Sequence, residues 1–579
     1  MILGRKRRNS AFCVKTLRRL FLQEFYFTLR EYRKDYRYMR KKNLVLLFFF
    51  LIIGGTLSVY LKYELLWDFA NYHYYNPWAF LNGRVNFDVA VAGLNAFFNP
   101  LPDVPLYLLI KYFNNYPDFI YFVQGMWFGA LAFTYAKIIS LFFDFQTPKG
   151  KILSVITFLI GITSWSCFMQ IGTSTNEIPL AFFVLTGLYL LLKQFSVPIQ
   201  SLAAFGISGF VLGMAMGLKL TNVTYCIASG ISLILFYRKL QRPLAVLFWF
   251  SFSGMAGFLV VNGFWMKEMW ELFHNPFFPF ANEIFKSEYM EQQNFSDRNY
   301  VPTSICELLL FPFKFNHSEG SAFIADYRLA FSYIIFIVYF IYLWVEKLRG
   351  KDIVRQMDVK QSFLIVWGLT AYIFWVNVFT ILRYAVPIFL ILSIFIVKSG
   401  VFCLPRRKSL QIIYFSIVNI LIFQFVMTPY FSQPWGYRKD ITSEKKENSY
   451  NRFVYVEDVD IPENSLILMY SNRTSAILPY WGQDKKRIRG IKIAQSFYLV
   501  KTVQGDKDFF EYNKKWKKYK EDVIREHKGP KIALVTSLSP FFLRDKYLEG
   551  MVCRKLRNNM ADWVLCVPPE FEKSVWSET

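Results

Sequence analysis

Long apolar runs recur along the chain, and they restrict what it can fold into. A membrane-spanning helix needs about 20 mostly apolar residues, and eleven segments approach that length. They lie at 44–61, 117–143, 151–169, 178–193, 201–217, 222–237, 244–264, 329–345, 361–379, 382–398 and 409–427. Hydrophobic residues make up 54% of the 579 residues, which is too apolar for a water-soluble domain. We therefore expect an α-helical polytopic membrane protein with about 11 transmembrane helices.

The basic residues indicate an orientation. Residues 1–43 hold fourteen Lys and Arg against Glu24, Glu31 and Asp35, and this is not the pattern of a cleavable signal peptide. In a membrane chain, Lys and Arg mark the cytoplasmic side and attract anionic lipid. The net charge of +25 therefore predicts contact with the bilayer and does not indicate a nucleic-acid partner.

The same rule divides the chain into domains. Residues 1–43 form a cytoplasmic N-terminal segment, and 44–427 form a transmembrane domain of the cytoplasmic (inner) membrane. Its external loops are 62–116 and 265–328, and 428–579 also lies outside. The last segment contains the strand-like runs "SLILMY" and "KIALVT" and the charged helical run "DFFEYNKKWKKYKEDVIREHK", which predict a small α/β extracytoplasmic domain.

Cysteine and histidine spacing gives no sign of a metal site. The seven cysteines are scattered, the four histidines are dispersed, and neither external loop contains a D-x-D motif. There is also no P-loop or Rossmann fingerprint. We expect no metal and no cofactor. Cys553 and Cys566 are close in sequence, and either a disulfide or two free thiols fits them.

The stretch "WDFANYHYYNPWAFLNGR", from Trp67 to Arg84, follows the first apolar run. Its aromatic residues suit the membrane interface. Asp68 is different, because a carboxylate held at that surface either pairs with a cation or serves as a tuned base. His73 is either a hydrogen-bonding tether or an assistant to Asp68. Asp88 is either a second acid or a turn residue.

Several stretches together resemble the GT-C glycosyltransferases, multi-span enzymes that use polyprenyl-phosphate sugars. They are the stretch just quoted, "FFNPLPD", "GLKLTN", "HNPFFPFANEIFKS" and "LRYAVP", and they occur in that order between about residues 40 and 430. The resemblance implies a GT-C-like fold and an external site where a sugar leaves a lipid phosphate while an acceptor hydroxyl attacks, usually with inversion. Residues 428–579 carry no attributable motif.

The resemblance gives Asp68 the position of the family's catalytic acid, where it would deprotonate the acceptor as general base. The alternative is a structural cap paired with Arg84. Lys219 and Arg383 are cations beside apolar sequence, and they would hold the phosphate as its charge grows. Both would otherwise contact lipid headgroups.

The remaining candidates for substrate binding lie in the external loops or at the start of a span. Glu177 opens the fourth apolar run, where a carboxylate also favours the helix dipole. Two pairs in the second external loop either bind each other or orient sugar hydroxyls. The full set of substrate-binding candidates is His73, Arg84, Glu177, Lys219, Asn275, Asp297, Arg298, Asp326, Arg328 and Arg383.

Two other functions fit a chain of this kind. A transporter or flippase of lipid-linked glycans would place charges deep within several spans and often contain an internal repeat. A noncatalytic membrane scaffold would use its outer domain to recruit partners. The preferred hypothesis remains a transferase whose partners are a polyprenyl-phosphate-linked sugar donor, the lipid bilayer, and a glycan, lipid or protein acceptor.

Overall fold

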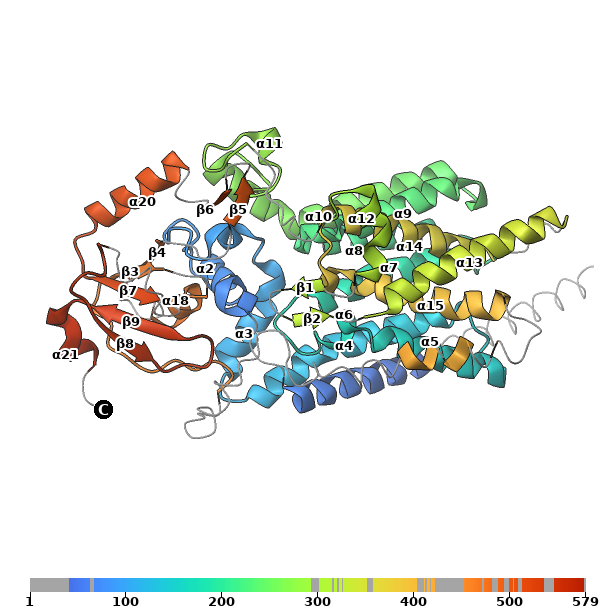
Figure 1. The fold of residues 1–579 in the computed structure, drawn as a ribbon, viewed down its shortest axis with the longest axis horizontal. Coiled ribbons are helices and arrows are strands. Elements are labelled where there is room, and N and C mark those ends of the chain that lie inside the picture. The colour runs from blue at the N-terminus through green and yellow to red at the C-terminus, as the bar shows by residue number, and fades with distance from the viewer. Residues whose placement is uncertain are drawn as a thin grey trace, which may run out of the picture.

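The protein consists of a long helical body with a sheet domain at one end (Figure 1). The elements of the first external segment, η1, α2 and α3, lie between these two parts. The computed structural model describes residues 41–62, 67–292, 301–314, 317–319, 322–324, 326–350, 358–403, 411, 414–416, 418–421, 452–470, 473–481, 488–493, 499–502, 505–508, 513–535 and 546–576.

The helical body is built from the apolar runs. Seven described helices are long and apolar enough to cross a membrane: Lys41–Leu61, α4 (Pro117–Ile139), α7 (Glu177–Gln194), α10 (Pro243–Phe273), α13 (Arg328–Leu348), α14 (Val359–Val378) and the stretch Leu382–Cys403, which contains α15 (Val386–Cys403). Three shorter helices match further predicted runs: α5 (Pro148–Ile162), α8 (Leu202–Leu218) and α9 (Val223–Leu235). The polytopic helical fold is thus confirmed. The run at 409–427 lies mostly outside the described residues, so the number eleven stays a prediction.

One predicted span is interrupted. The run 151–169 was expected to be continuous, but α5 ends at Ile162 and a four-residue helix, α6 (Trp165–Phe168), follows it. Ser164 between them adopts an extended backbone. The buried guanidinium of Arg328 donates to the carbonyls of Ile160 and Thr163, which satisfies backbone groups at this helix end.

Glycines let α8 and α10 approach closely. A Cβ atom on Gly213 would lie 1.9 Å from the backbone oxygen of Gly254, and one on Gly209 would lie 2.1 Å from that of Phe250. Small residues at such a crossing are typical of membrane helices, where close van der Waals packing drives association.

The described part of the segment predicted to be the first external loop, from Trp67 onward, is built of short helices. After the first span come η1 (Phe69–His73), α2 (Tyr75–Leu81), η2 (Gly93–Phe97), η3 (Leu101–Asp103) and α3 (Val104–Phe113). The proline-punctuated stretch that contains "FFNPLPD" leads directly into α3. The amide of Asn99 donates to the carbonyls of Gly217 in α8 and Val261 in α10, both at 3.0 Å. These bonds fix the segment on the end of α8 and on the inner part of α10.

The second external segment contains short elements. They are α11 (Asn282–Phe285), α12 (Ile305–Leu310), η6 (Phe311–Phe313) and a small hairpin of β1 (His317–Glu319) and β2 (Ala322–Ile324). Ser304 caps α12 and Glu307 reaches back to the backbone N–H of Thr303 at 2.8 Å. This is a capping box, and it explains why the helix begins there.

The C-terminal domain is the expected small α/β domain. Its sheet has five strands in the order β4-β3-β7-β9-β8. The strands are β3 (Leu466–Met469), β4 (Arg489–Lys492), β7 (Lys531–Val535), β8 (Val552–Leu556) and β9 (Trp563–Val567). The predicted runs "SLILMY" and "KIALVT" form β3 and β7, which are parallel, and the charged run contains α20 (Lys514–Glu526). A hairpin of β5 (Leu499–Thr502) and β6 (Gly505–Asp508) forms a separate sheet.

Cys553 and Cys566 form a disulfide between β8 and β9. The two residues lie directly opposite each other in the antiparallel register. The structure therefore decides between the two alternatives that the sequence left open.

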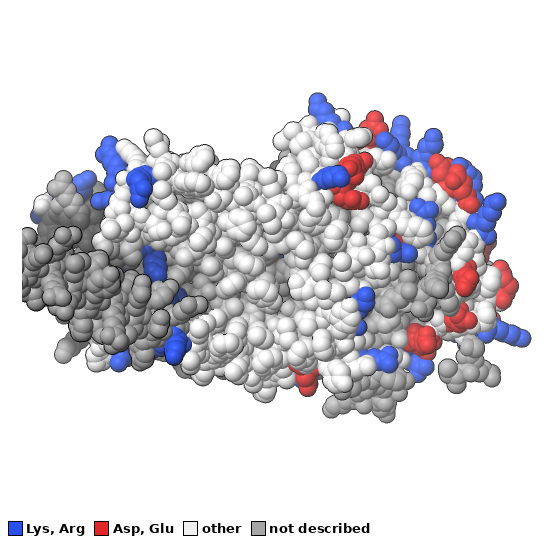
Figure 2. All heavy atoms as spheres, turned by 180° about the vertical axis from the view of Figure 1, so that it is seen from behind, with Lys and Arg blue, Asp and Glu red and all other residues white. Residues whose placement is uncertain are grey.

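The surface separates the chain into an apolar body and charged ends (Figure 2). On the face shown, a wide band of uncharged side chains covers the helical body, and Asp, Glu, Lys and Arg gather on the C-terminal domain. At the opposite end of the body, the described residues on this face include Lys and Arg but no Asp or Glu.

Candidate active site

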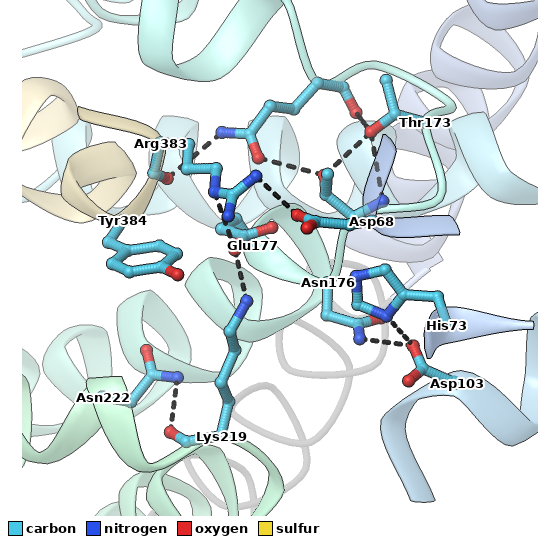
Figure 3. Close-up of polar contacts among 12 residues, drawn as sticks. Asp68, His73, Asp103, Thr173, Asn176, Glu177, Lys219, Asn222, Arg383 and Tyr384 are labelled. Atoms are coloured by element: carbon cyan, nitrogen blue, oxygen red, sulfur yellow. Dashed lines mark hydrogen bonds and ion pairs between the residues drawn. The ribbon is translucent and has the colours of Figure 1, made fainter. Parts of the chain in front are cut away.

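Four charged side chains of alternating sign meet at one end of the helical body, beside the first external segment (Figure 3). The carboxylate Oδ2 of Asp68 lies 2.7 Å from Nη1 of Arg383. Nε of Arg383 lies 3.9 Å from Oε1 of Glu177, and that oxygen lies 2.5 Å from Nζ of Lys219. The order Asp68, Arg383, Glu177, Lys219 leaves each cation beside a carboxylate, which offsets the cost of burial. We call these four residues the charge cluster.

Different elements supply each member of the charge cluster. Asp68 immediately precedes η1, Glu177 is the first residue of α7, and Arg383 lies in the 3-10 helix η8 (Leu382–Ala385). Lys219 is the extended residue between α8 and the 3-10 turn η4 (Leu220–Asn222). All four thus stand at helix ends, where the chain leaves the apolar body.

Tyr384 covers the two cations on one side. The Cζ atom of Arg383 lies 5.4 Å from the centre of the Tyr384 ring, and Nζ of Lys219 lies 4.9 Å from it. Such contacts stabilise cations that are partly removed from water. A small pocket opens here, and its walls include Glu177, Lys219, Asn222 and Tyr384.

One oxygen of the charge cluster has no hydrogen bond within the described part of the chain. Oε2 of Glu177 is buried and accepts nothing there, although Oε1 binds Lys219. A buried polar atom without a partner costs free energy. Glu177 therefore has bonding capacity that a hydroxyl or ammonium group entering the pocket can satisfy.

A histidine–aspartate pair lies beside the charge cluster. Nδ1 of His73 is 2.7 Å from Oδ1 of Asp103, and the amide of Asn176 donates to the same oxygen at 2.6 Å. The other ring nitrogen of His73 points away from Asp103, toward the side where Asn176 and Glu177 lie (Figure 3). A carboxylate on one ring nitrogen fixes the orientation of an imidazole and makes the other nitrogen available for binding or proton transfer.

Polar residues of the loop that precedes α7 lie beside the charge cluster. Gln170 donates to the carbonyl of Arg383 at 3.2 Å, and the hydroxyl of Thr175 donates to Gln170 at 3.0 Å. Thr173 and Thr175 are hydrogen-bonded to each other. This network holds the backbone of Arg383 in place and surrounds the charge cluster with hydroxyl groups.

Two aromatic hydroxyls of the first external segment stay protonated. Burial, and next the negative charge of Asp68, raise the pKa of Tyr72 well above its usual value. Burial and the neighbouring Asp88 do the same to the pKa of Tyr75. Both are therefore neutral hydrogen-bonding groups at physiological pH.

The structure thus brings five of the predicted residues together and separates others. Asp68, His73, Glu177, Lys219 and Arg383 lie in or beside the charge cluster. Their functional roles stay predictions.

The alternative in which Arg84 pairs with Asp68 is wrong. Arg84 binds Asp88 through two hydrogen bonds of 3.0 and 2.8 Å, because the two residues are four apart in one turn of chain. Asp88 also accepts hydrogen bonds from Tyr75 and from the N–H of Gly490. Burial raises the pKa of Asp88, and Arg84 opposes this. The turn role expected for Asp88 is what the structure shows.

Other predicted residues are engaged in local structure. Asn275 is completely buried, donates to the carbonyl of Phe280 at 2.9 Å and accepts from the N–H of Phe277 at 3.0 Å. Asp326 and Arg328 form the structural ion pair that was one of their two expected states, at 2.9 Å. Asp297 and Arg298 lie outside the described residues.

Sequence reasoning did not single out Asp103, Asn176, Gln170 or Tyr384. Three of them lie in or beside a feature that was noted: Asp103 ends "FFNPLPD", Asn176 precedes Glu177, and Tyr384 follows Arg383. Their spacing along the chain carried no signal, because their partners are on other helices. Among the described residues, no group of three or more His, Cys, Asp or Glu side chains is placed to hold a metal ion.

Comparison with known proteins gives a limited result. No protein-family model matches the chain, and no curated protein matches it. Among solved structures, ArnT from Cupriavidus metallidurans in the apo state aligns with 12% identity and a TM-score of 0.49, over 90% of this chain and 97% of that one. ArnT from the same organism bound to undecaprenyl phosphate aligns with 11% identity and a TM-score of 0.47 over the same shares. Both TM-scores lie below 0.5, so the geometry of the site has to carry the functional conclusion.

Proposed function

We propose that the protein is an integral membrane glycosyltransferase that moves a sugar from a polyprenyl-phosphate-linked donor to an extracytoplasmic glycan, lipid or protein acceptor, with Asp68 as general base. The observation that carries this proposal is the charge cluster. It places a carboxylate suited to take a proton beside Arg383, and Glu177 links this pair to Lys219. Two partly buried cations suited to bind a phosphate thus stand where the chain leaves the apolar body. The order of the quoted motifs, which resembles that of GT-C enzymes, supports the same reaction.

The reaction needs each of these groups. Asp68 takes the proton of the acceptor hydroxyl while the hydroxyl oxygen attacks the anomeric carbon. The bond between that carbon and the phosphate oxygen breaks, the lipid phosphate leaves with the electron pair, and the anomeric configuration inverts. Lys219 and Arg383 stabilise the charge that grows on the departing phosphate.

The ion pair between Asp68 and Arg383 links donor binding to the position of the base. Arg383 lies within 2.7 Å of Asp68 and engages one carboxylate oxygen. A phosphate bound to Arg383 competes for the same guanidinium. Donor binding therefore loosens this ion pair and frees that oxygen of Asp68 for the acceptor hydroxyl when the sugar is in place.

An apolar groove offers a place for the isoprenoid chain. It has a volume of about 290 Å³ and lies between α13, α14 and α15, with Leu308 and Pro312 at its edge. Its walls are almost entirely apolar side chains. It reaches the end of α14 at Asn377, and Arg383 follows a few residues later in the chain.

The orientation that we propose puts the charge cluster and the C-terminal domain outside the cytoplasm. Basic residues mark the opposite end of the body (Figure 2), as expected for the cytoplasmic side. The disulfide between Cys553 and Cys566 suits an oxidising compartment. A lipid-linked donor is the form in which a sugar is available on that side.

The test is mass spectrometry of envelope lipids and glycans from a deletion strain that carries wild type, Asp68→Asn or Glu346→Gln. Glu346 is the matched control. It is a buried acid that pairs with Arg349 at 2.7 Å, and it lies in the last turn of α13. We expect the deletion and Asp68→Asn to lose one sugar from a glycan and to accumulate a polyprenyl-phosphate sugar, whereas Glu346→Gln behaves as wild type. Normal transfer by a well-expressed Asp68→Asn protein would remove Asp68 from the mechanism and favour transport or scaffolding.

A further inference from the structure

Asp68 and His73, the two candidate site residues of the first external segment that lie at the charge cluster, stand at the two ends of one short element. Asp68 immediately precedes η1 and His73 is its last residue. The element is a five-residue π-helix, a rare conformation that occurs mostly as single turns within α-helices and frequently at functional sites. The relative position of Asp68 and His73 therefore depends on what keeps this turn in shape.

The C-terminal domain binds the middle of η1. The hydroxyl of Ser475 donates a hydrogen bond to the carbonyl of Asn71, and it also lies 3.4 Å from the carbonyl of Ala70. The N–H of Arg473 donates to the side-chain oxygen of Asn71 at 3.4 Å. Asn71 and Ser475 are both completely buried. A carbonyl buried in this way needs its partner, because water cannot replace it.

Ser475 is held rigidly by its own domain. It follows the carboxyl end of β3 and begins the 3-10 turn η10 (Ser475–Ile477). Arg473 adopts a left-handed backbone with φ of 65°, and its carbonyl accepts a hydrogen bond from the indole of Trp563 in β9 at 2.9 Å. The sheet thus fixes the backbone of Arg473, which itself binds Asn71.

The same domain is docked on the first external segment at points distant from Asp68. Val89 pairs with Ile491 and extends the edge of the sheet at β4. Asn114, after α3, donates to the carbonyl of Val454 at 2.9 Å. These contacts hold the domain in place, whereas the contacts of Ser475 and Arg473 reach the element that presents Asp68 and His73.

We propose that the C-terminal domain contributes to the active site through Ser475, a positioning residue that holds the π-helix between Asp68 and His73 in shape. This proposal rests on the proposed function only where it assigns chemistry to Asp68. The donor phosphate is held by Lys219 and Arg383, which belong to the helical body. Loss of the Ser475 contact therefore impairs catalysis and leaves phosphate binding intact.

The first experiment measures hydrogen exchange in the full-length protein in nanodiscs, comparing wild type, Ser475→Ala and Ser465→Ala. Ser465 is the matched control, because it is an equally buried serine of the same domain whose hydroxyl donates to the carbonyl of Pro462 at 2.6 Å. We expect faster exchange in residues 69–76 for Ser475→Ala alone. Unchanged exchange there would overturn the positioning role, and this result does not depend on any substrate.

The second experiment measures sugar transfer and the binding of undecaprenyl phosphate by the same variants and by Asp68→Asn. For Ser475→Ala we expect the transfer rate to fall about 10²-fold, the order expected for a displacement of about 1 Å at a reacting group, with undecaprenyl phosphate affinity not reduced. Ser475→Thr, which keeps the hydroxyl, should recover most of the rate. Faster exchange with an undiminished transfer rate would overturn the proposal. If Asp68→Asn transfers normally while Ser475→Ala does not, the assignment of Asp68 fails and the positioning role stands.

Discussion

The ion pair of Lys219 and Glu177 allows a prediction in which removing either partner lowers stability, whereas the two changes shift ligand affinity in opposite directions. The two charges are 2.5 Å apart, and their side chains are 20% and 5% exposed. Removing one partner of a buried pair costs about 3–5 kcal/mol, because the other charge is left uncompensated. Since Lys219 is partly exposed, we expect about 3 kcal/mol for Lys219→Met, near the low end of that range.

The ligand response distinguishes the two partners. Lys219→Met removes a charge-assisted contact to phosphate worth about 1.5–3 kcal/mol, so undecaprenyl phosphate affinity should fall about 10- to 100-fold. Glu177→Gln removes the negative charge between two cations, so it should destabilise the fold but raise the affinity. The double variant should recover part of the lost stability.

Thermal unfolding and native mass spectrometry of the protein in nanodiscs, with and without undecaprenyl phosphate, measure both quantities. Lys137→Met serves as the control, because Lys137 is also partly buried but lies in the last turn of α4 and donates to Asn43. Wild-type affinity in Lys219→Met, or weaker binding in Glu177→Gln, would refute the phosphate-binding role of this cluster.

Three further predictions concern the fold. Replacing Cys553 and Cys566 together by Ser should cost the C-terminal domain about 3 kcal/mol, the value expected for a closed loop of this size, measured by denaturant unfolding of the full-length protein. Burial lowers the pKa of His527 from its usual 6.5, so the unfolded chain binds a proton more readily than the folded one. The stability that is present above about pH 6.5 is therefore lost as the pH falls. His527→Gln should flatten this pH dependence, measured by hydrogen exchange of α20. Gly213→Val should force α8 away from α10 and lower the unfolding temperature in detergent, whereas Gly230→Val, at a glycine with open space around it, should not.

The sequence predicted the helical body correctly because each span is a local property. A run of about 20 apolar residues is marked by its own composition, whatever it packs against. The strands at 466–469 and 531–535 and the helix at 514–526 were recognised for the same reason. Helix ends were less well predicted, since a partner such as Arg328 ends α5 earlier than hydropathy indicates.

The residues of the candidate site also differ in whether the sequence alone could identify them. Asp68, Lys219 and Arg383 could be selected from sequence, because a charge next to apolar sequence is unusual. Their partners could not be selected. Arg84 belongs to the same quoted stretch as Asp68 and was considered as its partner, but Arg383, 315 residues away, occupies that place.

By itself, then, the sequence determined that the chain crosses a membrane repeatedly, carries an α/β domain at its end and places an acid at the exit of its first span. Only the tertiary structure decided that this acid faces Arg383, that Cys553 and Cys566 are opposite each other, and that Ser475 reaches the turn between Asp68 and His73. The physical reason is that hydrophobic patterning acts over a few turns of chain, whereas ion pairs and hydrogen bonds between distant segments depend on how whole helices and sheets pack.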